Sequence, residues 1–244
     1  MRTFIIFFLL LFIVGCNNEE TTKQIEDKIL TSESSPVKAD YIPDEVEKSE
    51  VLMNPPHTYY TDMWEASEDS NQAAGAACAV MAVKFFDKDT SFSIDIAKEL
   101  RTDENGYWNL SDIKSVIFPR GVKGEEEIYL SPDDIISALK SGYPVIAPID
   151  TTYIEYTPKS KDKSGRYYFW GSGHFVFING LTRKDDKLFY QVNDPYSMGH
   201  LNPDGTPIGE NRLYSIGDMD LAIKKWWSVI LILKPYDSMK DSED

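Results

Sequence analysis

Residues 73–86 read AAGAACAVMAVKFF, a run of small residues followed by larger apolar ones. Because apolar side chains occupy nearly every position, the run predicts a helix that is buried on all sides rather than along one stripe. Further helices are expected over 94–100, 109–117 and 131–140, the last of which opens with a Ser-Pro pair. The first half of the folded part is therefore expected to be helical around one buried central helix.

The second half of the chain changes from helical to strand-like periodicity. The expected strands cover 144–149, 173–181 (GHFVFINGL), 187–193 (KLFYQVN) and 228–233, with a last helix over 215–227. The polar stretches 151–170 and 196–214 are interpreted as long loops. Helices first and strands second favour an α+β fold over alternating α/β units.

The N-terminus has the features of a secretory signal. The first residues read MRTFIIFFLLLFIVGC, with an apolar core from Phe4 to Val14 that is too short to span a bilayer. Residues 13–16 (IVGC) resemble the lipobox of bacterial lipoproteins. The resemblance implies removal of residues 1–15 and acylation of Cys16, and hence a protein anchored by lipid in the bacterial cell envelope, outside the cytoplasm. The alternative is an ordinary signal or short anchor with a chance cysteine.

Behind the signal, the sequence predicts three parts. Residues 16–55 are expected to be the acylated cysteine and a flexible tether, residues 56–237 one folded domain, and residues 238–244 a disordered tail. The tether is rich in Glu, Lys, Ser and Thr, with Tyr41 as its one aromatic residue. Such a segment cannot bury enough apolar surface to offset the entropy lost on ordering.

Composition excludes several functions. The net charge of −15 at pH 7 argues against nucleic-acid binding, because phosphates attract Lys and Arg. With Cys16 acylated, Cys78 is the remaining thiol, so no intrachain disulfide is expected. His57 and His200 lie in loop-like sequence and are interpreted as surface residues. No metal-binding spacing and no cofactor motif is found, so neither a metal nor a cofactor is expected.

Four stretches, in this order, resemble the papain-like C39 and C39-like cysteine peptidases. They are the helix at 74–86, a helix leading into a Gly-x-Pro-Val strand entry at 133–145, GHFV at 173–176 and VNDP at 192–195. Each stretch is short, but their joint order and spacing cover most of residues 70–235. The resemblance implies a papain-like α+β domain, with a helical first half and an antiparallel sheet in the second.

The resemblance also implies a site: a thiol nucleophile, a histidine that takes and returns its proton, and a carboxylate that orients the histidine. His174 matches the base and Asp194 the carboxylate. The family's cysteine falls on Ala74, whose methyl group cannot attack a carbonyl. The family's oxyanion-stabilising Gln falls on Glu68, and Gln72, two residues before Ala74, is the other candidate for that role.

Three interpretations of Ala74 stay open. In the first, the chain is a degenerate peptidase that keeps the fold. In the second, Cys78 serves as the nucleophile from the same helix face; the competing interpretation is a buried core thiol, because one helical turn moves it about 5.4 Å away. In the third, Ala74 was introduced in place of a catalytic cysteine.

The expected function is that of a membrane-anchored C39-like domain whose peptide-bond hydrolysis is lost or reduced because of Ala74. The alternatives are a lipoprotein that binds a peptide or protein partner without cutting it, and a structural envelope lipoprotein. The aromatic run 167–170 precedes His174 and is expected to line a cleft or to cover the core. Trp226 and Trp227 are expected to pack the last helix against the last strand.

Overall fold

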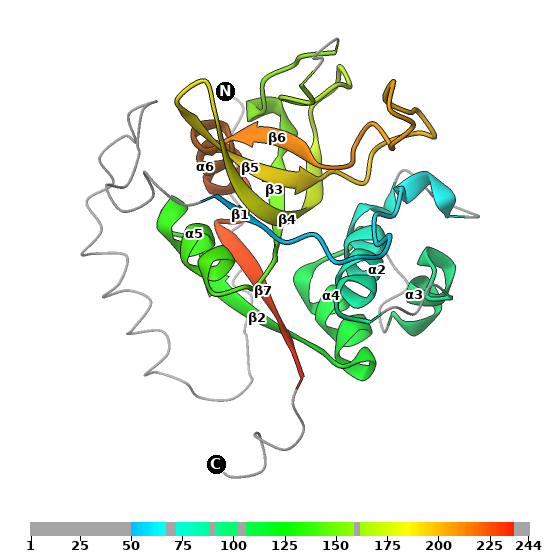
Figure 1. The fold of residues 1–244 in the computed structure, drawn as a ribbon. Coiled ribbons are helices and arrows are strands. Elements are labelled where there is room, and N and C mark those ends of the chain that lie inside the picture. The colour runs from blue at the N-terminus through cyan, green and yellow to red at the C-terminus, as the bar shows by residue number, and fades with distance from the viewer. Residues whose placement is uncertain (1–49, 67–71, 88–90, 102–105, 159–161, 237–244) are drawn as a thin grey trace, which may run out of the picture. The chain divides into compact units, whose positions relative to one another are not determined.

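The computed structural model describes residues 50–66, 72–87, 91–101, 106–158 and 162–236. The signal segment, Cys16, nearly all of the predicted tether, Glu68 and the tail 238–244 lie outside these residues. Over the described part, the chain forms an antiparallel sheet with helices on both faces, which confirms the expected α+β fold (Figure 1). None of the helices described there is long and apolar enough to cross a bilayer.

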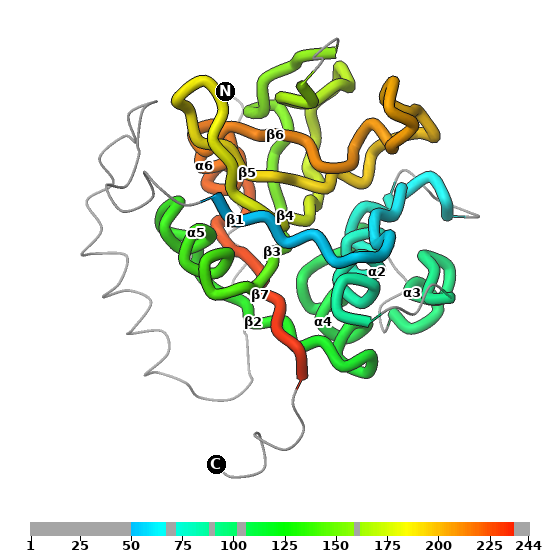
Figure 2. The backbone as a smooth tube through the Cα atoms, in the orientation of Figure 1, coloured from blue at the N-terminus to red at the C-terminus, as the bar shows by residue number. Residues whose placement is uncertain are grey.

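The sheet of the described part has seven strands, in the order β2-β7-β3-β4-β5-β6, with β1 paired to β4. The strands are β1 (Val51–Leu52), β2 (Val122–Ile128), β3 (Val145–Asp150), β4 (Gly173–Lys184), β5 (Lys187–Asn193), β6 (Arg212–Ser215) and β7 (Val229–Pro235). Figure 2 shows the path of the chain, with β1 alongside β4 near the middle of the sheet. Each strand pair is antiparallel.

Two helical layers cover the sheet. The longer helices are α2 (Ala74–Phe86), α3 (Ile94–Leu100), α4 (Leu110–Ile117), α5 (Pro132–Lys140) and α6 (Ile216–Lys224). Figure 1 shows α2, α3 and α4 grouped on one side and α5 and α6 on the other. Because side chains alternate along a strand, Phe175 and Phe177 join the core with α2, whereas Val176 and Ile178 join the core with α5 and α6.

Helix α2 is the buried central helix that the sequence predicts. All of its residues from Ala74 to Val83 are buried. Its small side chains let β4 and α4 approach closely, and Phe85 near its end packs on Phe177 with ring centroids 5.7 Å apart. The residue before the helix is Ala73, so no side chain caps its first turn.

The predicted tether is too long at its C-terminal end. Val51–Leu52 pair with β4 as a short strand, and the amide of Met53 donates to the carbonyl of Asn179 at 2.9 Å. Folded structure therefore begins before residue 56, because the open edge of β4 supplies hydrogen-bond partners to the backbone of residues 51–53. The prediction of the tether used composition alone and could not include these partners.

Two of the strands, β2 and β6, are not predicted by the sequence pattern. β2 reads VKGEEEI, yet all of its residues pair with β7 at the edge of the sheet. Charged side chains are typical of edge strands, which lack the apolar alternation used to find central ones. β6 (Arg212–Ser215) begins inside the stretch 196–214, where the sequence predicts a loop, and ends at the first residue of the predicted last helix.

The described parts of the stretch 151–170, residues 151–158 and 162–170, are held by two buried arginines. Arg166 donates to the carbonyls of Ile154, Tyr168 and Phe169 at 2.9, 2.6 and 2.6 Å. Arg212 on β6 donates to the carbonyl of Gly165 at 2.6 Å. Because guanidinium groups satisfy several carbonyls at once, the described residues that follow the short 3-10 helix Thr151–Tyr153 are held without a long helix or strand.

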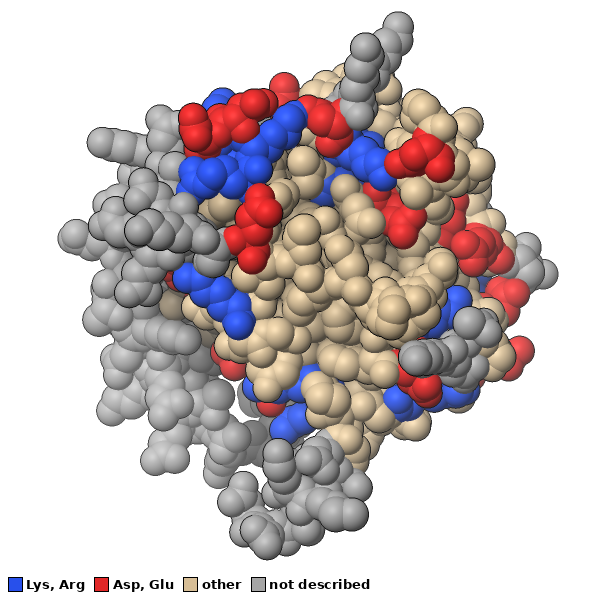
Figure 3. Space-filling model, in the orientation of Figure 1, with Lys and Arg blue, Asp and Glu red and all other residues tan. Residues whose placement is uncertain are grey.

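The surface is mixed in charge on the face shown in Figure 3, where Lys and Arg lie among Asp and Glu rather than in a separate basic area. This face offers no extended basic surface to phosphates, in line with the acidic composition.

We expect Phe177→Ala to lower the free energy of unfolding by about 3–5 kcal/mol, because it removes a fully buried ring that contacts Tyr59 and Phe85. Urea unfolding followed by circular dichroism measures the change. Phe169→Ala is the matched control, since its side chain is 72% exposed, and a change below about 0.5 kcal/mol is expected there. Equal losses in both variants would contradict the assignment of Phe177 to the core.

Candidate active site

A histidine and an aspartate from neighbouring strands meet at one end of the sheet. His174 is the second residue of β4, and Asp194 follows directly after β5. The register of β4 and β5 places Phe177 opposite Asn193, which brings the two side chains within reach of each other. His174 Nε2 lies 2.9 Å from Asp194 Oδ1, with the histidine 8% exposed and the aspartate fully buried.

Asp194 accepts three further hydrogen bonds. The hydroxyls of Tyr168 and Tyr214 donate to Oδ2 at 2.9 and 2.5 Å. The backbone N–H of Tyr196 donates to Oδ1 at 3.0 Å. These donors fix the plane of the carboxylate, and the carboxylate in turn fixes the ring of His174.

The hydrogen bonds decide the ionisation of this cluster. Burial opposes ionisation of Asp194, but the charge of His174 and the hydrogen bonds from His174, Tyr214 and the Tyr196 amide outweigh it, so the pKa of Asp194 is held below 3.8. Burial, and then the charge of Asp194, raise the pKa of Tyr168 and of Tyr214 well above 10.0. Both tyrosines therefore remain neutral donors to an ionised carboxylate.

The orientation of His174 leaves one ring nitrogen for chemistry. With Nε2 donating to Asp194, Nδ1 is the nitrogen left for chemistry: it carries a proton in the charged imidazolium and a lone pair in the neutral ring. A proton acceptor held by a carboxylate is the arrangement of a general base.

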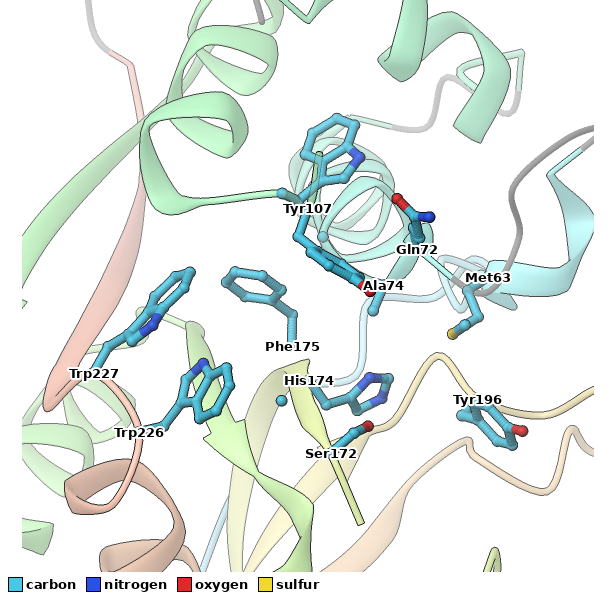
Figure 4. Close-up of a pocket in the computed structure, with 13 residues that line it drawn as sticks. Met63, Gln72, Ala74, Tyr107, Ser172, His174, Phe175, Tyr196, Trp226 and Trp227 are labelled. Carbon is cyan, nitrogen blue, oxygen red and sulfur yellow. The ribbon is translucent and has the colours of Figure 1, made fainter. Parts of the chain in front are cut away.

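Ala74 and His174 line one pocket of about 450 Å³. Figure 4 shows the methyl group of Ala74, at the start of α2, across from the ring of His174. On the helical side the pocket is lined by Met63, Gln72, Ala74, Gly75, Tyr107 and Trp108. On the sheet side it is lined by Ser172, Gly173, His174, Phe175, Tyr196, Trp226 and Trp227. The pocket thus joins the predicted nucleophile position to the predicted base.

Cys78 lies one turn further along α2 and does not line this pocket. Its side chain is fully buried in the core. Burial, and then the charge of Asp194, raise the pKa of the Cys78 thiol well above 9.0. In this position the thiol is a protonated core group.

The other predicted site residues divide between the pocket and its surroundings. Gln72 lines the pocket, whereas Glu68 lies outside the described residues. In the aromatic run 167–170, Tyr168 binds Asp194 and Trp170 Nε1 donates to the hydroxyl of Tyr196 at 3.1 Å. None of the four side chains in this run lines the pocket itself.

The remaining histidines lie elsewhere. His57 is half-buried rather than on the surface, because its Nε2 lies 2.6 Å from the carbonyl oxygen of Lys84 in α2. His200 is exposed, as expected. Within the described ranges, no three His, Cys, Asp or Glu side chains converge as metal ligands.

The sequence prediction for Trp226 and Trp227, as residues that pack the last helix against the last strand, did not place them at the pocket. Trp108 and Tyr196, which also line the pocket, were not predicted as site residues. Helix α6 ends at Lys224 rather than at 227, so both tryptophans fall between α6 and β7, where each is 42% exposed and lines the pocket. Tyr196 follows Asp194 by two residues, a spacing that could have pointed to it. No local pattern links the tryptophans to the site.

We expect Asp194→Asn to lower the free energy of unfolding at pH 7 by about 1.5–3 kcal/mol, because an ionised hydrogen-bond acceptor is lost. The folded pKa of Asp194 is depressed, so its stabilisation is full above about pH 4 and is lost as the pH falls through the folded pKa. Urea midpoints of the parent and the variant should therefore converge below pH 4.

Asp186→Asn, the same substitution at an exposed turn position, is the control and should leave the midpoint nearly unchanged at pH 7. A gap between Asp194→Asn and the parent that stays constant from pH 7 to pH 3 would rule out an ionised Asp194 as the source of the stability.

Comparisons with known proteins place the chain in a family. A sequence model of the Peptidase_C39 like family matches residues 57–204, which include Ala74, His174 and Asp194. Among solved structures, the chain is similar to a protein from Bacillus anthracis described as a C39-like peptidase, with 12% identity over 78% of this chain and 100% of that chain and a TM-score of 0.49. It is also similar to a double glycine motif protease from an AMS/PCAT transporter, solved in complex with the leader peptide, with 14% identity over 77% and 92% and a TM-score of 0.41. No curated protein matches significantly. Because the family match covers more than half of the sequence, the chain belongs to the Peptidase_C39 like family.

Proposed function

We propose that this chain is a C39-like domain that binds a peptide in the pocket between α2 and β4 without hydrolysing it. One observation carries the proposal: the methyl group of Ala74 lines the pocket where the family has its nucleophile, while the His174–Asp194 pair remains intact at 2.9 Å. A methyl group has no lone pair, so the acyl-transfer step cannot begin.

The surroundings support a site that keeps everything except the nucleophile. His174 presents Nδ1 as the free ring nitrogen, and Asp194 is held ionised behind it. The first turn of α2 has no side-chain cap, and the positive end of a helix dipole favours negative charge there. A thiol at position 74 would therefore lie beside His174 and at the N-terminus of α2, and an imidazolium and a helix N-terminus both lower the pKa of a cysteine.

Cys78 does not replace the missing nucleophile in this proposal. Its thiol is fully buried, is absent from the pocket lining and has a raised pKa. Thiolate reactivity needs access and ionisation, and Cys78 has neither.

Binding is preferred over a purely structural role because the pocket is open and holds ordered aromatic and polar groups. A domain retained only as an envelope scaffold would have no need to keep a buried His-Asp pair, whose ionised carboxylate requires several donors.

We further propose that the domain is held at a membrane of the bacterial cell envelope through acylated Cys16. The apolar core before Cys16 and the polar residues after it support this attachment. Two or more acyl chains would make the attachment stable, since each buried CH₂ contributes about 0.8 kcal/mol.

Ala74→Cys is expected to create a thiolate with a pKa of about 4–7, because the new thiol sits at the start of α2 beside His174. The measurement is the iodoacetamide alkylation rate of the full chain as a function of pH, read at each cysteine by peptide mass spectrometry. Adding His174→Ala should move the pKa of the new thiol towards about 8.5.

Cys78 in the same samples is the internal control and should stay unmodified while the protein is folded. A new thiol that titrates near 8.5 and does not respond to His174→Ala would defeat the proposal that residue 74 occupies the nucleophile position. Rapid alkylation of Cys78 in the parent chain would instead favour Cys78 as the nucleophile.

Cys16→Ser is expected to abolish incorporation of labelled fatty acid and to shift the protein from the membrane fraction to the soluble fraction of a bacterial host. Fractionation and labelling with an alkynyl fatty acid measure the two effects. Asn17→Ser is the control and should keep the label. Labelling that persists in Cys16→Ser would show that Cys16 is not the lipid attachment point.

A further inference from the structure

Two glycines, one beside Ala74 and one beside His174, leave room for two tryptophan side chains in the wall of the pocket. Gly75 follows Ala74, and a Cβ there would lie 2.4 Å from Cβ of Trp108. Gly173 precedes His174, and a Cβ there would lie 2.2 Å from Cζ2 of Trp226. The wall can form only because both positions lack a side chain.

The sheet-side end of the pocket is an aromatic surface open to solvent. Trp226 stacks on Trp227, with ring centroids 6.1 Å apart and planes 19° apart, and Trp227 meets Phe175 edge-on at 5.6 Å. Both tryptophans are 42% exposed. Figure 4 shows them on one side of His174 and Phe175, away from Met63 and Tyr196 on the other.

The opposite wall is fixed in place. Trp108 is 4% exposed and lies under Arg101, whose guanidinium carbon is 5.2 Å from the ring centroid. Arg101 is itself held by Asp112 at 3.0 Å. A side chain held in this way, as Trp108 is, offers a preformed surface, which reduces the entropy lost on binding.

We propose that the Trp226–Trp227 end of the pocket is a subsite for one large apolar or aromatic side chain of the bound peptide. This inference rests on the proposed peptide-binding function and names the peptides that the site selects. Among the described residues, no Lys, Arg, Asp or Glu lines the pocket, so a charged peptide side chain would lose its hydration without gaining an ionic partner from them. A glycine would leave the exposed rings in contact with water.

The neighbourhood of the site favours a peptide side chain as the occupant. The aromatic end is continuous with Ala74 and His174, where the peptide backbone would lie, and the volume of about 450 Å³ holds more than a single group. An aromatic or branched side chain gains both burial and ring contacts against such a surface. A fatty acyl chain is the competing occupant, and the experiment separates the two.

The test titrates the full-length chain with four blocked peptides, Ac-Ala-Xaa-Ala-Ala-NH₂, in which Xaa is Gly, Leu, Phe or Lys. Saturation-transfer-difference NMR gives the dissociation constants and identifies the peptide protons in contact with the protein. The Leu and Phe peptides are expected to bind about 10- to 100-fold more tightly than the Gly peptide, with transfer strongest at the Xaa side chain. The Lys peptide should show no such gain.

Variants connect the preference to the tryptophans. Trp226→Ala and Trp227→Ala should each reduce the ratio of Phe to Gly affinity by about tenfold. Gly173→Ala should reduce it as well, because the new methyl displaces the end of the Trp226 ring. Phe118→Ala, an exposed aromatic outside the pocket, and Gly217→Ala, where a Cβ meets nothing within 4 Å, are the matched controls and should keep the ratio.

The outcomes distinguish this subsite from the proposed function. Four peptides that bind equally, with no effect of the Trp variants, would overturn the subsite and leave peptide binding in place. No binding of any peptide to the folded chain would overturn both. If lauric acid binds, its binding depends on Trp226 and no peptide binds, the occupant of the pocket is an acyl chain and the proposed peptide subsite is wrong.

Discussion

A carboxylate without exposure to water must be surrounded by donors, and Asp194 meets this constraint by drawing on four separate segments. His174 comes from β4, Tyr214 from β6, Tyr168 from the long segment after β3, and the amide of Tyr196 from the chain just beyond Asp194. The same bonds that keep the carboxylate ionised therefore also assemble the sheet end on which the pocket is built.

Among the described site residues, Ala74 is the one predicted departure from a peptidase site, and Glu68, the second predicted departure, lies outside them. The helix that carries residue 74 is buried and has no side-chain cap, the ring of His174 is held by Asp194, and the pKa of Asp194 is lowered so that this carboxylate is ionised. Replacing a thiol by a methyl group at a buried helix start changes little in packing, because both are small and apolar. A substitution of this kind can remove hydrolysis and leave the shape of the pocket unchanged.

The walls of the pocket follow from close packing as much as from chemistry. Gly75 and Gly173 stand beside the two facing site residues and let Trp108 and Trp226 lie directly on the backbone. In the proposed function, a pocket with no charged lining among the described residues selects peptides by burial of an apolar side chain, whereas the His174–Asp194 pair marks where the peptide bond would lie. The proposed binding function and its side-chain preference thus use two different parts of one pocket.

The sequence by itself determined the α+β class and the buried helix at 74–86, because these depend on local periodicity. The contact between His174 and Asp194 was predicted from the resemblance of residues 173–176 and 192–195 to a known family. The sequence did not predict β2, because its run of acidic residues lacks the apolar alternation of a strand. It also did not predict that Trp226 and Trp227 are exposed. Only the tertiary structure decided these, since strand partners and pocket walls come from segments distant in the chain, and their contacts leave no local period to read.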